Sequence, residues 1–328
     1  MSLLEESKTY KPFKFAWAVE AAIDHEKIHW GEWEAKLQED VSQWQNGKLS
    51  PVEKHHITQI LKLFTQSDVA VGRNYLEYYI PKFKNNEIRA MLSSFANREF
   101  VHQRAYALLN DTLGLPEEEF SAFLEYKVMR DKVDFMGDID THSHAGTALA
   151  IARSVMNEGM SLFSAFIMLL NYQRYGKMKG MCEIVEWSIR DETMHTEGMV
   201  KLFRAFCDEH SKIVNDEFKK QIYDMFRTAV ALEDKVIDNA FEMGEIEGLT
   251  AHDVKQYIRY LADRRLIQLG LKGNWKVKEN PLDWLEWVLN GASHKNFFEG
   301  TVTDYNSDGM EGDWGWTPLE ENNEQQNS

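Results

Sequence analysis

The residues with the clearest capacity for chemistry are two copies of a Glu-x-x-His motif, Glu99 with His102 and Glu192 with His195. Residues three apart share one face of a helix, so each motif can offer a carboxylate oxygen and an imidazole nitrogen to one metal ion. A single motif of this kind is a weak signal, because the same spacing occurs twice more in this chain. The sequence around each motif must therefore show which of the motifs indicate a metal site.

A lone carboxylate precedes each motif at a similar distance. Asp68 lies 31 residues before Glu99, and Glu158 lies 34 residues before Glu192. If each pair lies on an antiparallel helical hairpin, the turn must come near the midpoint for both carboxylates to reach the same depth. The two midpoints coincide with sequence breaks that contain Pro, Asn or Gly, at residues 81–86 and 175–177.

Two such hairpins packed together would bring four carboxylates and two imidazoles to one interior point. This is the ligand set of ferritin-like di-iron and di-manganese bundles. Hard carboxylate oxygens with one imidazole per ion suit iron or manganese better than zinc or copper. Burying four carboxylates without cations would be very costly, so two divalent ions give the cluster a physical reason to exist. The predicted ligands are Asp68, Glu99, His102, Glu158, Glu192 and His195.

The two remaining Glu-x-x-His motifs lack this arrangement. Glu53 is explained by a helix start, with Ser50 as the N-cap and Pro51 as the first helical residue. Glu26 lies too near the start of the chain to have an upstream carboxylate partner.

A tyrosine lies next to the predicted metal site. Tyr106 follows His102 by four residues, which places its phenol one helical turn along the same face. There it could be oxidised by the metals and hold the electron hole. The alternative is an ordinary core tyrosine with a hydrogen bond.

Long helices must position these side chains. Only six prolines occur, none of them between Pro116 and Pro281, and that stretch is rich in residues that favour helix. Because 43% of the 328 residues are apolar, the chain can fill a large core. We therefore predict an all-α fold. Helix breaks are expected near 114–116, 137–146, 244–250 and 270–281, besides the two turns above.

The two ends of the chain differ from this helical body. Residues 1–50 are aromatic-rich and broken into short pieces, and we expect them to pack on the body as an arm. The tryptophans expected to pack it are Trp17, Trp30, Trp33 and Trp44. From residue 299 the sequence loses apolar periodicity and becomes acidic and polar, which predicts a flexible tail over 299–328. The body, with its arm, would span residues 1–298.

Charge and cysteine content exclude several functions. A net charge of −16 disfavours binding to nucleic acid, whose phosphates need clustered Lys and Arg. Cys182 and Cys207 do not form a CxxC pair and are too few for a disulfide framework, which favours a reducing cytoplasm. The sequence has no signal-peptide pattern and no run of eighteen apolar residues, so neither secretion nor a membrane span is expected.

The sequence resembles the small, β subunit of class I ribonucleotide reductase. The resemblance covers residues 12 to 316 and is carried by strings such as FTQSDVAVG, NREFVHQRAY, MNEGMSLFSAF, WSIRDETMH, YIRYLADRRLIQLGL and NFFEGTVTDY. It implies a ferritin-like helical bundle with additional helices. One metal would be held by Asp68, Glu99 and His102, the other by Glu158, Glu192 and His195, with a tyrosyl radical on Tyr106. Two iron ions are expected, with two manganese ions or a mixed Mn/Fe pair as alternatives. Leu162 and Phe166 are implied as apolar walls, a role that simple core packing would also explain.

The resemblance also implies partners. The radical would pass to a separate α subunit, which carries the catalytic cysteines and reduces the ribonucleoside diphosphate. Asp191 would orient His102 and link it to Trp30, and Tyr305 would continue the path, although Trp33 is a rival because the family's usual proline does not follow Trp30. The acidic aromatic stretch 308–316 would bind the α subunit, but residues 317–328 continue past the family's usual end. A homodimer is implied, and the resemblance leaves open whether a flavoprotein or another reductant activates the metals.

Three other functions remain open from the sequence. A substrate-oxidising or ligand-binding di-metal protein would use the same scaffold but would not need Tyr305 or the acidic tail. Metal storage, as in ferritins, would use a far shorter chain. A purely structural helical protein would leave the six ligands without metal.

Overall fold

The protein is built from helices. The computed structural model describes residues 2–118, 121 and 125–285, and within these residues it forms no β-strand. The all-α prediction is therefore confirmed. The longer helices are α3 (Pro51–Asn74), α5 (Asn86–Leu113), α8 (His144–Met156), α10 (Lys179–Glu209), α11 (Asp216–Ala240) and α12 (Ala251–Gln268). Shorter ones are α1 (Ala16–Lys27), α2 (Gln38–Gln45), α4 (Ile80–Lys82), α7 (Lys127–Met136) and α9 (Phe163–Leu170). Tyr305 and the predicted tail 299–328 lie outside the described residues.

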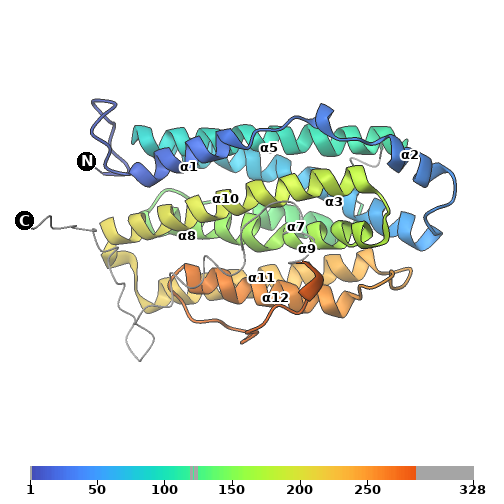
Figure 1. Cartoon of the computed structure of the whole chain (residues 1–328). Coiled ribbons are helices and arrows are strands. Elements are labelled where there is room, and N and C mark those ends of the chain that lie inside the picture. Colours follow the sequence, from blue (N-terminus) through green and yellow to red (C-terminus); the bar gives the residue numbers. More distant parts are fainter. Residues whose placement is uncertain (1, 119–120, 122–124, 286–328) are drawn as a thin grey trace, which may run out of the picture.

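The long helices lie side by side along a common direction (Figure 1). Helices α1 and α5 form one edge of the bundle, α8 and α10 lie in its middle, and α11 and α12 form the opposite edge. Helix α3 packs against α5, and α10 packs against both α8 and α9. One continuous apolar core runs between these layers. No helix in the described part of the chain has the length and apolar character needed to cross a bilayer.

Both predicted hairpin turns are present. The first helix pair breaks at Phe83, whose backbone is extended, and α5 starts after Asn85, whose side chain accepts hydrogen bonds from two backbone N–H groups of its first turn. The second pair breaks at Gly176, in the left-handed region at φ 63°, which glycine adopts without steric cost. The start of α3 is also as predicted. Ser50 Oγ accepts from the Glu53 N–H at 3.2 Å, and the Glu53 carboxylate accepts from the Ser50 N–H at 2.8 Å.

The N-terminal arm packs on the body through α1, which lies against α5. Trp30 is buried at 2% exposure, whereas Trp33 is 70% exposed. The prediction that Trp33 packs on the body is therefore wrong. Its ring lies against Gly31, where a Cβ would come within 2.3 Å of it, and most of the indole is in solvent.

Two of the long helices contain π turns. The segment η2 (Tyr75–Tyr79) follows α3 directly, and η3 (Asn157–Ser161) joins α8 to α9. A π turn adds one residue to a helical turn and is often found at functional sites. Glu158 lies in η3 and Tyr75 begins η2, so both irregularities occur at the centre of the bundle.

Candidate metal centre

The six predicted ligands gather at one buried point. Asp68 comes from α3, Glu99 and His102 from α5, Glu158 from η3, and Glu192 and His195 from α10. Each is at most 1% exposed. Their donor atoms form two overlapping groups that could each hold an ion: Glu99, Glu158, Glu192 and His195, and Asp68, Glu99 and His102. The doubled spacing in the sequence thus corresponds to a real convergence.

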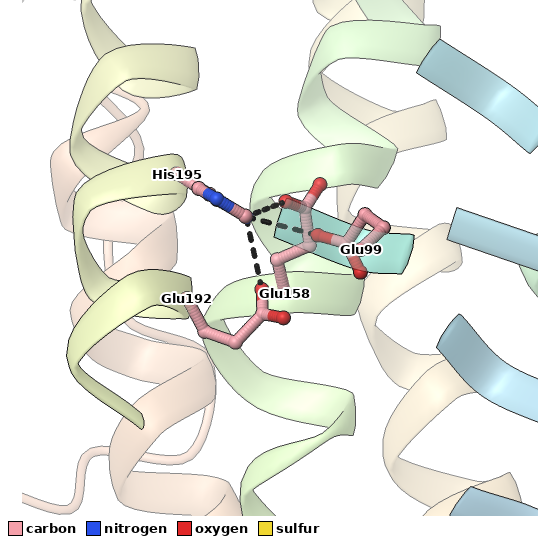
Figure 2. A group of neighbouring side chains, drawn as sticks. All are labelled: Glu99, Glu158, Glu192 and His195. Carbon is pink, nitrogen blue, oxygen red and sulfur yellow. Dashed lines mark hydrogen bonds and ion pairs between the residues drawn. The ribbon is translucent and has the colours of Figure 1, made fainter. Parts of the chain in front are cut away.

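Two glutamates lie between the two imidazoles. Glu99 Oε1 is 3.0 Å from His195 Nδ1, and Glu99 Oε2 is 3.8 Å from His102 Nδ1. Glu192 repeats the pattern, with Oε1 3.2 Å from His102 Nδ1 and Oε2 3.4 Å from His195 Nδ1. Figure 2 shows His195 facing Glu99, Glu158 and Glu192. Because each of the two glutamates offers one oxygen to each side, both are placed to bridge a pair of ions.

The other two carboxylates lie at the ends of the cluster. Asp68 belongs to the group around His102, and Glu158 to the group around His195. Glu158 Oε2 is 3.1 Å from His195 Nδ1 and accepts a hydrogen bond from the Tyr75 hydroxyl at 2.7 Å. Each end of the cluster therefore has one imidazole and one carboxylate of its own.

The cluster contains too many buried acceptors for its donors. Within the described residues, Asp68 Oδ2 and both carboxylate oxygens of Glu99 and Glu192 accept no hydrogen bond. Burying such oxygens is costly unless a cation or donor satisfies them. Two divalent ions would balance the four carboxylates and leave the imidazoles neutral. The residues present therefore fit a di-metal site.

The excess of negative charge shifts the pKa values of the side chains in the cluster. Burial alone lowers the pKa of His102 and His195, but hydrogen bonds to the surrounding carboxylates outweigh it and raise both well above the usual range. Burial, together with the neighbouring carboxylates, raises the pKa of Asp68 well above its ordinary value and that of Glu158 to about 7. For Glu99 the attraction of the two nearby imidazoles outweighs burial, so its pKa is lowered. When no cation is bound, protons on these groups would therefore offset part of the negative charge.

Tyr106 lies beside the cluster and is fully buried. Its hydroxyl donates to Ser188 Oγ at 3.0 Å, and its ring meets Phe64 edge to face at 4.3 Å between centroids. Burial raises the pKa of this phenol well above its ordinary value, and the negative charge of Asp68 adds to the shift. The phenol therefore stays protonated in an apolar surrounding next to the cluster. The predicted walls, Leu162 and Phe166, are also buried.

Asp191 connects the cluster to the N-terminal arm. Its Oδ2 accepts from Trp30 Nε1 at 2.7 Å and lies 3.1 Å from His102 Nε2. The indole of Trp30 also stacks on the His102 ring, with centroids 5.8 Å apart. Of the two candidate tryptophans, Trp30 makes these contacts, whereas Trp33 is exposed.

Three contacts around the site were not predicted from the sequence. The buried guanidinium of Arg98 donates to both oxygens of Asp191 at 3.1 and 3.0 Å, which makes Asp191 part of a buried ion pair as well. The pKa of Asp191 is lowered to about 2 because its hydrogen bond to His102 and the charges of His102 and Arg98 outweigh burial. His25 Nε2 lies 3.1 Å from His195 Nε2, and Tyr75 contacts Glu158. The only sequence signal for these three was an ionisable or aromatic residue inside an apolar helix face.

An all-helical bundle whose core holds four carboxylates and two histidines defines the class of ferritin-like di-metal carboxylate proteins. The family model described as "Ribonucleotide reductase, small chain" matches residues 7–281. The chain therefore belongs to the ribonucleotide reductase small-chain family, which consists of oxidoreductase subunits.

Known proteins similar to this chain agree with that family. The probable ribonucleoside-diphosphate reductase small subunit 048L of Invertebrate iridescent virus 3 is 41% identical over 96% of this chain and 89% of its own. The ribonucleotide reductase R2 subunit from Clostridium botulinum has a similar fold, with a TM-score of 0.81 and 21% identity over 88% of this chain and 94% of its own. The dimanganese(II)-NrdF of Streptococcus sanguinis has a TM-score of 0.75 and 18% identity over 87% of this chain and 99% of its own.

Proposed function

We propose that the six-residue cluster of this ribonucleotide reductase small subunit holds two metal ions and that Tyr106 stores a radical beside them. The observation that carries the proposal is the position of Glu99 and Glu192, each with one oxygen toward either imidazole. Asp68 and Glu158 would each bind one ion at the ends. With oxygen, the bound ions would supply the one-electron oxidation of a nearby phenol.

The chain's own residues would make that phenol Tyr106. Its hydroxyl hydrogen is directed at Ser188 Oγ, so the phenol is held in one orientation. Phe64 and the other buried apolar residues around the ring exclude water, which would quench a radical. Its raised pKa keeps the proton on the phenol until the electron leaves.

We propose iron as the metal, with a manganese pair or a mixed Mn/Fe pair as alternatives. Carboxylate oxygens and single imidazoles accept either metal. The test is to load the metal-free protein with Fe(II), admit oxygen and record an EPR spectrum, with Tyr106→Phe as the control. A tyrosyl signal in the native chain that is absent from the control supports the proposal. No signal with iron, or with manganese and an added oxidant, refutes it.

Radical export to an α subunit would begin at His102, Asp191 and Trp30, which are in direct contact. We propose that Tyr305 and the tail 299–328 continue the path and bind the α subunit, with residues 1–298 as the metal-binding body. Deletion of residues 299–328 should leave metal binding intact and abolish turnover that depends on the α subunit. Unchanged turnover would contradict the role of the tail.

We further propose that the chain forms a homodimer and acts in the cytoplasm, with a flavoprotein or another reductant activating its metals. Exposed apolar side chains on neighbouring segments support a dimer. They are Val69 on α3, Leu76 on η2 and Phe100 on α5. The two free, buried cysteines agree with a reducing compartment. Sedimentation of the native chain and of Phe100→Glu would test the dimer.

A further inference from the structure

We propose that Tyr75 is a positioning residue of the metal centre, whose phenol holds the carboxylate of Glu158 in the orientation that binds the ion on the His195 side. The inference rests on the proposed function, because it concerns how one of the proposed ligands is held. Tyr75 is not part of either Glu-x-x-His motif and lies 83 residues before Glu158.

The carboxylate of Glu158 is held differently from the bridging carboxylates. Tyr75 is fully buried, and its hydroxyl donates to Glu158 Oε2 at 2.7 Å. The other oxygen, Oε1, accepts from the hydroxyl of Ser154, one turn earlier in the same helix. Within the described residues, the oxygens of Glu99 and Glu192 accept no hydrogen bond at all. Glu158 is therefore oriented by protein hydroxyls, while the two bridging glutamates are left free for ions.

Both partners of this hydrogen bond lie in π turns. Tyr75 is the first residue of η2, and Glu158 is the second residue of η3. One extra residue turns the following side chains by about 100° around the helix axis, so the π turns determine which residues face the centre. Arg265 fixes η3 from outside, because its Nε donates to Gly159 O at 2.9 Å and a Cβ on Gly159 would lie 2.6 Å from that nitrogen. The backbone is thus fixed by Arg265, and the carboxylate by Tyr75 and Ser154.

The phenol becomes the more important donor once an ion is present. When no ion is bound, His195 Nδ1, which lies 3.1 Å from Glu158 Oε2, can be a second donor to this oxygen. An imidazole nitrogen that binds a metal cannot carry a proton, so a bound ion removes this donor. The Tyr75 hydroxyl can keep its hydrogen bond to Oε2. Donors of this kind orient the ligand, and their removal typically weakens metal binding by about 10- to 100-fold.

The test is a titration of the full-length, metal-free chain with Mn(II), in which the free ion is followed by EPR. We expect the native chain to bind two ions. In Tyr75→Phe, which removes only the hydroxyl, one binding step should keep its affinity and the other should weaken by about 10- to 100-fold. The EPR spectrum of the bound pair should also change, which is a readout independent of turnover.

Tyr79→Phe is the matched control. Tyr79 lies in the same π turn and is buried, but its hydroxyl donates to the backbone oxygen of Ala150 at 2.9 Å instead of to Glu158. It should bind both ions like the native chain. Equal weakening in the Tyr75 and Tyr79 variants, or native affinities in Tyr75→Phe, overturns the proposal.

Two further outcomes are decisive. If the native chain binds no Mn(II), Fe(II) or Co(II), the di-metal function itself fails, and the inference fails with it. If Tyr75→Phe does not fold by circular dichroism, Ser154→Ala replaces it, because it removes the donor to the other oxygen of Glu158. Selective weakening of one binding step in Ser154→Ala supports the positioning of Glu158 by hydroxyl groups, and unchanged binding overturns it.

Discussion

The buried ion pair between Lys132 and Glu233 allows a test of how buried charges affect the stability of the chain. Lys132 on α7 and Glu233 on α11 are 3% and 1% exposed, and Lys132 Nζ lies 2.8 Å from Glu233 Oε1. Lys132 also donates to the backbone oxygen of Ser161 in η3 at 2.9 Å, and Ser164 Oγ donates to the other oxygen of Glu233 at 2.7 Å. The perturbation is Lys132→Met, which removes the charge and keeps most of the volume.

The expected loss in the free energy of unfolding follows from the Glu233 carboxyl, which the substitution leaves without its partner. Removing one partner of a buried ion pair costs about 3–5 kcal/mol, because the other charge is left uncompensated. Burial already raises the pKa of Glu233 above 4.5 in spite of Lys132, so in the variant Glu233 should take up a proton. Neutralising a carboxyl of pKa 4.5 at pH 7 costs roughly 3.4 kcal/mol, at about 1.36 kcal/mol per unit. We therefore expect a loss of about 3 kcal/mol, or roughly 4 °C in Tm for a chain of 328 residues.

Because the loss arises from protonation of Glu233, the stability of Lys132→Met should depend on pH in a definite direction. In the variant, folded Glu233 carries a proton that the unfolded chain releases above pH 4.5, so stability falls as the pH rises. The deficit relative to the native chain should therefore shrink from about 3 kcal/mol at pH 7 to roughly 1–1.5 kcal/mol at pH 5.5.

Urea unfolding of the metal-free chains, followed by circular dichroism at both pH values, measures this deficit. The double variant Lys132→Met with Glu233→Leu removes both charges and should return to within about 1 kcal/mol of the native stability. A deficit in Lys132→Met that is the same at both pH values would refute the reasoning.

Three more outcomes are expected. Burial lowers the pKa of His56 from 6.5 to about 3, so the destabilising effect of this residue is absent above pH 6.5 and grows as the pH falls toward 3. Between pH 7 and 5, the free energy of unfolding in urea should therefore fall by about 2 kcal/mol more in the native chain than in His56→Gln. Divalent ions at 100 times their Kd should stabilise the native chain by about 2.7 kcal/mol per bound ion in thermal melts and should not stabilise Glu99→Ala to the same degree, whereas an equal shift in both would argue against ligation by Glu99. Trp30→Phe, which loses the Nε1 donor to Asp191, should bind metal normally but lose turnover with the α subunit, and Trp33→Phe should retain it; the reverse result would assign the path to Trp33.

The sequence alone determined the local structure and the side chains that we propose as metal ligands. Ser50 at the start of α3 and Gly176 before α10 are local signals, because capping and left-handed backbone depend on a few neighbouring residues. The Glu-x-x-His spacing puts a carboxylate and an imidazole on one face of any helix. Two similar hairpins then required the four carboxylates to meet, because their turns fell at matching positions.

Only the tertiary structure decided how these ligands are held. The contacts of Tyr75 with Glu158, Arg98 with Asp191 and His25 with His195 join residues 83, 93 and 170 positions apart. Each depends on which helix faces pack together and on π turns that local propensity does not reveal. Trp30 and Trp33 are chemically identical in the sequence, and packing buried one and left the other in solvent. Spacing along one helix is fixed by backbone geometry, whereas contacts between helices are fixed by the packing of the whole core.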